Sequence, residues 1–176
     1  MAPNPDRLRR IKWLYHFTDA RNIPTIRELG GLWSTAKLRE KGVKFHPGGN
    51  QHSLDADEMF GMDQFVHLCF SSSHPLAHLA SSDGRIEHLQ WIYIDDPAAV
   101  FELDGVRYSE EVANKSGAGI HPIQYARDNF DAVALHDYLD WNASDGQARR
   151  QAVEKCEILV PDHLPLKYFE ERLPKP

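Results

Sequence analysis

Short runs of branched and aromatic residues recur along the chain, between polar segments that contain glycine or proline. Runs of this length and composition are typical of β-strands. We therefore predict strands at residues 11–17 ("IKWLYHF"), 64–70 ("QFVHLCF"), 89–95 ("LQWIYID"), 130–137 ("FDAVALHD") and 156–160 ("CEILV"), with a further, proline-interrupted candidate at 161–169.

Capping residues and turn glycines predict short helices between these strands. Asn22 is expected to cap a helix that has Pro24 in its first turn and ends at Gly30-Gly31. The other predicted helices are one capped by Thr35, one capped by Ser73, one over residues 122–129 and one capped by Ser144. Residues 43–63 are polar and contain several glycines, and we interpret them as a long functional loop.

Strands and short helices follow one another without regular βαβ alternation. This order favours an α+β fold with a mostly antiparallel sheet over a doubly wound parallel one. The length of 176 residues corresponds to about one domain, and a hydrophobic content of 41% is enough for one core. We therefore expect a single domain over residues 1–176, in which residues 1–10 form a flexible basic N-terminus.

The same composition bears on where the protein acts. No apolar stretch is long enough to span a bilayer, and the N-terminal segment lacks the apolar core of a signal peptide. Cys69 and Cys156 both lie in apolar runs, which is typical of reduced core cysteines. We expect a monomeric cytoplasmic protein that does not associate with a membrane.

The charge balance is acidic. The net charge is −6, from 20 basic and 26 acidic residues, which argues against bulk electrostatic binding of nucleic acid. Local basic strips could still contact phosphates. Two strips are present: Arg7, Arg9, Arg10 and Lys12 near the N-terminus, and Lys37, Arg39, Lys41 and Lys44 further along. From charge alone, solvated surface is the better interpretation of both strips.

Familiar catalytic and metal-binding patterns are missing from the sequence. His74 and His78 are spaced i, i+4 and would share a helix face, but no third metal ligand stands at a convincing spacing. His46 and His52 flank part of the 43–63 loop and have no partner ligand either. We therefore predict no metal site. The serine-hydrolase elbow, the P-loop and the Rossmann glycine pattern do not occur.

Polar residues instead stand at or within predicted strands. His16 and Thr18 end the first strand, serines follow "HLCF", and Glu157 lies inside the apolar "KCEILV". A buried carboxylate is costly without a partner or a task. Taken singly, His16 is better read as a core histidine bonded to backbone, and Glu157 as an edge-strand residue facing water. Their joint occurrence at separate strands favours a functional site.

Four segments resemble the DarT family of bacterial toxins, which ADP-ribosylate nucleic acid using NAD. They are "YHFTDARNIPTIRELGGLWS" (15–34), "GGNQHSLDADEMFGMDQFVHLCFSSSHPL" (48–76), "YSEEVANKSGAGIHPI" (108–123) and "QAVEKCEILVPDHLPLKYF" (151–169). The first and last are specific as a pair. The resemblance implies an ADP-ribosyltransferase-like fold, NAD as co-substrate and single-stranded nucleic acid, DNA above all, as the acceptor.

The resemblance also implies roles for individual residues. Glu157 would be the catalytic glutamate, and His16 would hydrogen-bond the adenosine ribose of NAD. The other implied NAD-binding residues are Thr18, Asn22, Gly31, Leu32, Phe70, Ser71 and Ser72, with Phe70 packing against the nicotinamide. The nucleic-acid surface would be the segment 37–63, with Lys37, Lys41, Lys44, His46, Asn50 and Gln51 as substrate-binding residues and Phe45 and Phe60 as stacking candidates.

The sequence departs from the well-known members at positions that concern the acceptor. "SSSHPL" lacks the arginine of their Pro-Arg-Ser-Pro element, and Lys155 replaces a common glutamine. For the arginine of their central loop, this sequence offers Arg39, Lys44, His46, Asn50 and Gln51 as alternatives. "GGNQHS" and "VANKSG" resemble a subgroup expected to modify guanine rather than thymine. The alternatives are RNA or a protein side chain as acceptor, or a non-catalytic nucleotide-binding module. The family also implies a macrodomain antitoxin of the DarG type as partner.

Overall fold

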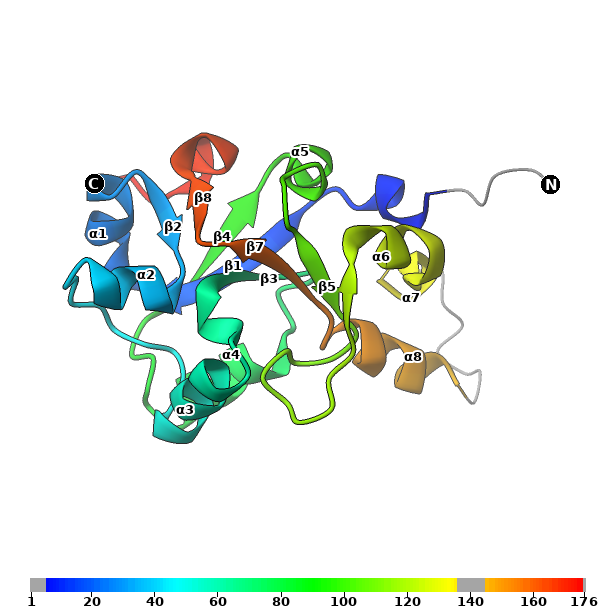
Figure 1. The fold of residues 1–176 in the computed structure, drawn as a ribbon, viewed down its shortest axis with the longest axis horizontal. Helices are drawn as coiled ribbons and strands as arrows, with labels where there is room; N and C mark the ends of the chain where they lie inside the picture. Colours follow the sequence, from blue (N-terminus) through cyan, green and yellow to red (C-terminus); the bar gives the residue numbers. More distant parts are fainter. Residues whose placement is uncertain (1–5, 136–144, 176) are drawn as a thin grey trace.

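The protein is built on a six-stranded antiparallel sheet. The computed structural model describes residues 6–135 and 145–175. The sheet has the order β4-β1-β3-β7-β5-β6, and a two-stranded ribbon, β2-β8, lies beside it (Figure 1). The strands are β1 Leu14–Asp19, β2 Gly31–Trp33, β3 Phe65–Cys69, β4 Leu89–Ile94, β5 Arg107–Ser109, β6 Ile120–Pro122, β7 Glu157–Pro161 and β8 His163–Pro165. This arrangement confirms the predicted α+β class with a mostly antiparallel sheet.

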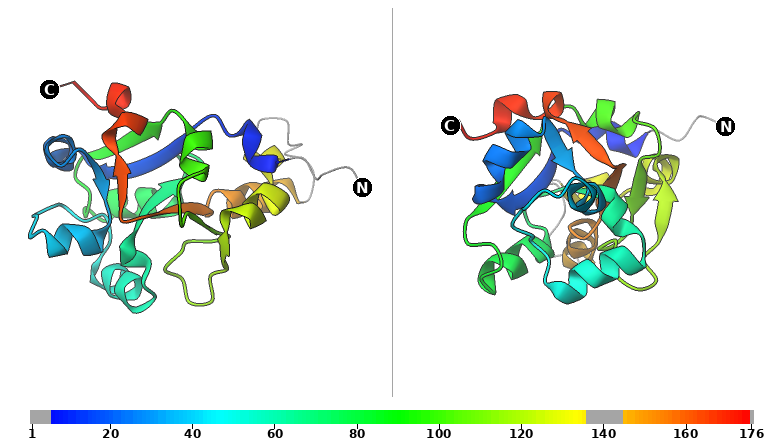
Figure 2. Two further views of the ribbon diagram at one scale, coloured as in Figure 1. Left: turned by 45° about the horizontal axis from the view of Figure 1, so that its top comes forward. Right: turned by 60° about the vertical axis from the view of Figure 1, so that its left-hand side comes forward.

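Short helices surround the sheet. They are α1 Ile23–Glu28, α2 Thr35–Glu40, α3 Gln51–Met59, α4 Pro75–Ser82, α5 Pro97–Phe101, α6 Ile123–Asn129, α7 Ala132–Leu135 and α8 Gly146–Val153, with 3₁₀ turns η1 Arg7–Arg10, η2 Ala20–Asn22, η3 Met62–Gln64, η4 Leu166–Tyr168 and η5 Glu170–Arg172. Helices α1 and α2 lie near the β2-β8 ribbon, α6–α8 lie at the opposite end, and α3 and α4 lie below the central strands in the view of Figure 1 (Figures 1 and 2). None of these described helices has the length and apolar character of a bilayer span.

The two faces of the central strands differ in chemistry. Side chains alternate between the faces of a strand, so one face carries Leu14, Leu68 and Ile158, which are fully buried in the main hydrophobic core. Glu157 pairs with Cys69 of β3 and with Ser109 of β5, which places polar groups on the other face. Cys69 and Cys156 are buried free thiols, as the sequence predicted.

Residues 130–135 do not form the predicted strand. Residues 132–135 are helix α7, and residues 136 and 137 of the predicted strand lie outside the described part of the chain. Asp131 starts the helix by accepting from the amide of Ala134, and Arg149 of α8 holds the Asp131 carboxylate with two nitrogens at 2.7 and 2.9 Å. Alanine favours helix, and Ala132 and Ala134 are small enough to be buried under α8.

The 43–63 segment is also more regular than predicted. Asn50 accepts a hydrogen bond from the Ser53 amide at 2.9 Å and begins α3, and η3 follows directly before β3. The predicted capping residues are corrected elsewhere too. Ser34, not Thr35, caps α2, and His74, not Ser73, caps α4. The predicted cap Ser144 lies outside the described residues.

Residues 6–10, expected to belong to a flexible arm, pack against the domain. Residues 7–10 form η1, the Asp6 carboxylate caps it, and Leu8 is 1% exposed. Arg127 of α6 reaches Asp6 at 2.6 Å. The buried Leu8 side chain and the ion pair between Asp6 and Arg127 therefore anchor this basic turn. Residues 1–5 lie outside the described part.

Asp19, at the end of β1, holds the chain at the edge of the site described below. Its side chain is fully buried, and it accepts hydrogen bonds from the amides of Arg21 and Glu87 and a two-nitrogen ion pair from the Arg21 guanidinium. The hydrogen bonds to Arg21 keep the pKa of Asp19 well below its ordinary value, although burial opposes this. Asp19 thereby joins β1 to the segment that leads into β4.

We predict that Asp19→Ala lowers the free energy of unfolding by about 1–3 kcal/mol, because the variant leaves the backbone amides of Arg21 and Glu87 and the Arg21 guanidinium without their buried acceptor. Because the folded-state pKa is lowered, this stability is present above about pH 4, the ordinary value, and is lost as the pH falls. Urea unfolding at pH 7 measures the effect. Asp95→Ala, which breaks the more exposed pair with Arg172, is the control and should cost under about 1 kcal/mol. Equal losses would contradict the assignment.

Candidate active site

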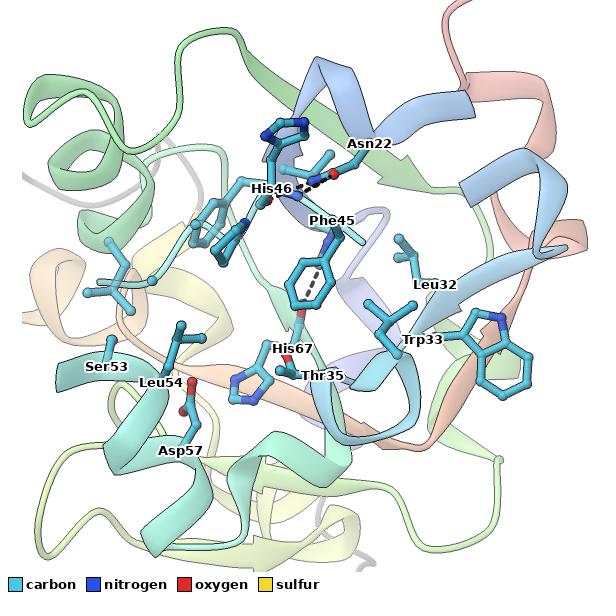
Figure 3. Close-up of a pocket in the computed structure, with 18 of the residues that line it drawn as sticks. Asn22, Leu32, Trp33, Thr35, Phe45, His46, Ser53, Leu54, Asp57 and His67 are labelled. Carbon is cyan, nitrogen blue, oxygen red and sulfur yellow. Dashed lines mark hydrogen bonds between the residues drawn. The ribbon is translucent and has the colours of Figure 1, made fainter. Parts of the chain in front are cut away.

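A pocket opens between the polar face of the sheet and the segments that carry α1 to α3 (Figure 3). It brings together seven of the residues that the sequence singled out, from five different parts of the chain. They are His16, Thr18, Asn22, Gly31, Leu32, His46 and Glu157. Phe45, one of the two stacking candidates, lines it as well.

Glu157 is the buried acid of this pocket. It is 2% exposed, so it is not an edge-strand residue facing water. Its Oε2 accepts from the Ala113 amide at 2.8 Å and lies 3.3 Å from His67 Nδ1, and its Oε1 lies 3.4 Å from His74 Nε2. Burial alone would raise the pKa of Glu157, but His67, His74 and the Ala113 amide together lower it. Glu157 is therefore a buried, ionised carboxylate that lines the pocket.

His67 of β3 is a site residue that the sequence reasoning missed. Its ring lies between Glu157 and the carbonyl oxygen of Met62, which is 3.0 Å from Nε2. Burial lowers the pKa of His67, but Glu157, with Asp57, raises it to about 9. A usable signal was present: histidine interrupts the apolar run "FVHLCF" two residues before Cys69, and so lies on the same face as Glu157.

The sequence allowed His16 to be a core histidine bonded to backbone or a residue of a functional site, and the structure shows both features. Its Nδ1 lies 3.0 Å from the carbonyl oxygen of His67, so it is bonded to backbone, and it also lines the pocket. Because a carbonyl only accepts, Nδ1 carries the proton and Nε2 is left as an acceptor. Burial lowers the pKa of His16 to about 4, so the ring is neutral at pH 7.

Asn22 holds together two segments that line the pocket. Although it precedes α1, its side chain makes no cap hydrogen bond. Its amide instead donates to Thr18 Oγ1 at 3.0 Å and to the His46 carbonyl at 2.8 Å, and its Oδ1 accepts from the His46 amide at 2.8 Å (Figure 3). One buried carboxamide thus fixes the segment around His46 against the end of β1.

Gly31 has a packing role at the rim. Its φ is +152°, and a Cβ there would lie 2.3 Å from the carbonyl oxygen of Leu164 and 2.5 Å from the His163 ring. Any side chain would therefore separate β2 from β8. Leu32, which follows, is 3% exposed and lines the pocket from the ribbon.

Three predicted NAD-binding residues do not line this pocket. Phe70 is buried in the core and stacks on Phe130 with ring centroids 4.2 Å apart, so the expected contact with the nicotinamide is not supported. Ser71 is buried and accepts from the Ser73 amide at 3.2 Å, and Ser72 is exposed. They follow the end of β3, where the chain has already turned toward α4.

Most of the predicted nucleic-acid residues lie outside the pocket as well. Lys37 pairs with Glu40 at 2.8 Å, Lys41 lies over the Trp33 ring with its Nζ 4.3 Å from the centroid, and Lys44 is exposed. Asn50 caps α3, and Gln51 donates to Asp55 at 2.6 Å. Of the six, His46 lines the pocket. Phe60 is 43% exposed on the far end of α3.

Arg85 is a second residue that the sequence reasoning missed. It lines the pocket from the turn between α4 and β4. Its guanidinium is held by Asp83, with Nε 2.7 Å from Oδ2, and donates to the Gly48 carbonyl at 2.8 Å. The sequence offered no spacing signal for Arg85, because only the fold brings this turn to the glycines at 48 and 49.

The histidine pair considered as a metal site is divided by the fold. His74 is fully buried beside Glu157, whereas His78 is exposed on α4. Among residues 6–135 and 145–175, no cluster of three or more His, Cys, Asp or Glu side chains could hold a metal ion.

Comparisons with known proteins show the family of the chain. A family model described as "ssDNA thymidine ADP-ribosyltransferase, DarT" matches residues 15–171. Comparison with curated proteins gave no match.

Solved structures of the same family share the fold. The Thermosipho africanus DarTG structure in complex with ADP-ribose is 17% identical with a TM-score of 0.68; the match covers 90% of this chain and 42% of that one. Thermus sp. 2.9 DarT in complex with ADP-ribosylated ssDNA is 14% identical with a TM-score of 0.66, covering 91% and 79%. The same Thermus protein in complex with NAD+ gives a TM-score of 0.59. The predicted ADP-ribosyltransferase-like fold is confirmed.

We predict that Asn22→Ala loosens the segment around His46, because both backbone bonds of His46 to Asn22 are lost. Amide hydrogen exchange measured by mass spectrometry should rise in peptides covering residues 43–50, and the free energy of unfolding should fall by about 1–3 kcal/mol. Asn129→Ala, at an exposed asparagine that bonds only its own helix, is the control. Unchanged exchange in peptides 43–50 would show that Asn22 does not hold this segment.

Proposed function

Since the chain belongs to the DarT family of ssDNA ADP-ribosyltransferases, we propose that it transfers ADP-ribose from NAD to a base of single-stranded DNA and releases nicotinamide. The family match over residues 15–171 confirms the resemblance to DarT that the four sequence segments indicated. The observation that carries the proposal is the buried Glu157 carboxylate in a pocket that His16, Thr18 and Arg85 also line.

The pocket residues suit a dinucleotide. His16 Nε2 and the Thr18 hydroxyl are acceptors that a ribose hydroxyl can meet, and the neutral state of His16 favours a hydrogen bond over charge contact. Arg85 is oriented by Asp83 and Gly48, and its guanidinium geometry matches phosphate oxygens. We assign the ribose to His16 and Thr18 and the diphosphate to Arg85.

Glu157 would serve both halves of the reaction. As the bond between ribose C1′ and the nicotinamide nitrogen breaks, its electron pair passes to that nitrogen and positive charge develops on the ribose. A carboxylate fixed in a buried position stabilises that charge without reorganising. The acceptor nitrogen then bonds to C1′ and loses a proton, which the Glu157 carboxylate accepts. The hydrogen bond from Ala113 and the contact with His67 hold the carboxylate in place for both steps.

We propose guanine as the acceptor base, although the family description names thymidine. The two segments that resemble the guanine-modifying subgroup, residues 48–53 and 112–117, meet beside Glu157. Asn114 donates to Ser53 Oγ at 3.0 Å, while the neighbouring Ala113 amide binds the catalytic carboxylate. Because these two segments are joined next to the Glu157 carboxylate, they are positioned to contact the base that reacts.

Two alternatives share the fold. RNA or a protein side chain could be the acceptor, and the experiment below separates these from DNA. A non-catalytic nucleotide-binding module is disfavoured, because it gains nothing from a buried ionised carboxylate. From the same resemblance we propose a DarG-type macrodomain partner. A monomeric state and a cytoplasmic location remain predictions.

We predict that the purified protein adds one ADP-ribose to mixed-sequence single-stranded DNA in the presence of NAD, and that Glu157→Gln lowers the rate by about 10²–10⁴-fold. The isosteric amide removes the charge but keeps the shape. Mass spectrometry of the oligonucleotide detects the adduct, and fragmentation identifies the base. Matched RNA and a total protein extract are the competing acceptors.

Each result of that experiment has a distinct meaning. A guanine adduct supports the whole proposal, whereas a thymine adduct keeps the reaction and rejects the base. An adduct on RNA or protein alone rejects DNA. Full activity of Glu157→Gln would refute the assigned role of the carboxylate.

We also predict that changing Lys37, Lys41 and Lys44 to glutamine weakens single-stranded DNA binding and reduces the slope of log K against log salt by up to about 2, at roughly 0.7 per phosphate contact. NAD affinity should not change, because none of the three lines the pocket. The control replaces Lys12, Lys167 and Lys175, which removes the same charge elsewhere. Fluorescence anisotropy at several salt concentrations measures the slope. An unaltered slope would place the DNA surface elsewhere.

A further inference from the structure

We propose that His67 is a positioning residue for Glu157: it lies as an imidazolium between the Glu157 carboxylate and the Met62 carbonyl, and holds the carboxylate ionised and oriented for the reaction. This inference rests on the function proposed above. It adds to Glu157 a second residue that fixes both the charge state and the orientation of the glutamate.

The two hydrogen-bond partners of the His67 ring indicate its charge state. Nδ1 of His67 lies 3.3 Å from Glu157 Oε2, and Nε2 lies 3.0 Å from the Met62 carbonyl oxygen. Both partners are acceptors, since one is a carboxylate and the other a carbonyl. A neutral imidazole has one N–H and could satisfy one of them. The imidazolium has two and satisfies both.

The groups around His67 on the neighbouring elements favour the same charge state. Besides Glu157 on β7, the carboxyl group of Asp57 on α3 faces the ring (Figure 3). His16 on β1 is neutral, as is His74 before α4, whose pKa is lowered chiefly by burial. Burial also raises the pKa of Asp57, whereas Glu157 lies within 3.3 Å of the His67 ring. Glu157 is therefore the main counter-charge of His67.

A charged histidine at position 67 costs free energy to bury, so the choice of this residue needs a physical reason. His67 pairs across the sheet with Leu159, and Leu159 packs with Met62 and Ala113 in a small apolar cluster. An aliphatic side chain at position 67 would extend that cluster without the cost of burying a charge. The polar choice is explained if the carboxylate of Glu157 must stay ionised, because burial alone would raise its pKa.

His67 also connects the catalytic carboxylate to the proposed nucleic-acid side. Met62 begins η3, which directly follows α3 and precedes β3. The imidazolium therefore bridges the last turn of the 37–63 segment and the first residue of β7. A displacement of that segment would move the Met62 acceptor and, through the ring, the Glu157 carboxylate.

The charge state can be measured without enzyme activity. The full chain, with histidine labelled by ¹³C and ¹⁵N, is titrated by NMR, and the His67 signal is assigned by its loss in His67→Asn. We expect His67 to titrate near pH 9 in the wild type, and at least two pH units lower in Glu157→Gln. Titration of His67 at or below about 6.5, the ordinary value, in the wild type would overturn the proposal.

The consequence for catalysis is read from pH–rate profiles of the wild type, His67→Asn and His67→Gln. Asparagine places an amide near the Nδ1 position and glutamine near Nε2, so each keeps one hydrogen bond and neither carries the charge. We expect the acid limb of kcat to move upward by at least one pH unit in both variants, with a smaller change in KM for NAD. His78→Gln, at an exposed histidine, is the matched control and should leave the profile unchanged.

The two experiments separate this inference from the proposed function. Near-UV circular dichroism first establishes that both variants are folded, and if one is not, the other carries the test. An active wild type with unshifted acid limbs in the folded variants would overturn the role of His67 and leave the function standing. An inactive wild type would refute the function, and the NMR titration would still decide whether His67 is the imidazolium partner of Glu157.

Discussion

The burial of one carboxylate is the constraint on which the rest of this site depends. Glu157 is 2% exposed at the start of a central strand, where its ionised form is strongly disfavoured by desolvation. The fold offsets that cost with the Ala113 amide at 2.8 Å, the His67 ring at 3.3 Å and the His74 ring at 3.4 Å. These three groups come from separate segments, so the charge state of Glu157 is fixed only once the central strands and the 110–119 loop have assembled.

Residues in and beside the pocket walls also hold the surrounding elements together. Asn22 ties the His46 segment to β1, and Gly31 allows β2 to approach β8 more closely than any side chain would permit. Asp19 holds the end of β1 to the turn before β4. Because the site rests on rigid strand ends and short capped helices, its acceptors are oriented before a ligand arrives, which is the condition for electrostatic stabilisation of a developing charge.

Among the described residues, local pattern predicted the four longer strands and helices α1, α2, α4, α6 and α8, but it missed the three-residue strands β2, β5 and β6. Strands 1, 3, 4 and 7 were foreseen because branched and aromatic residues fill them, whereas α7 was read as a strand since its alanines, buried under α8, look like a short apolar run. Helix α3 was missed because its cap, Asn50, lies in a glycine-rich stretch that resembles a loop. Resemblance to a family suggested Glu157 and His16, which line the pocket, but it also suggested Phe70, which the structure places in the core.

The sequence by itself determined the fold class and the family, and the resemblance to that family drew attention to Glu157 and His16. Tertiary structure alone decided which polar groups surround them. His67 and Arg85 reach the pocket from segments 90 and 72 residues away from Glu157 in the chain, counted as 157 − 67 and 157 − 85. No local pattern encodes such a meeting, because periodicity describes how one element faces its neighbours, whereas the charge state of a buried acid depends on every element that packs against it.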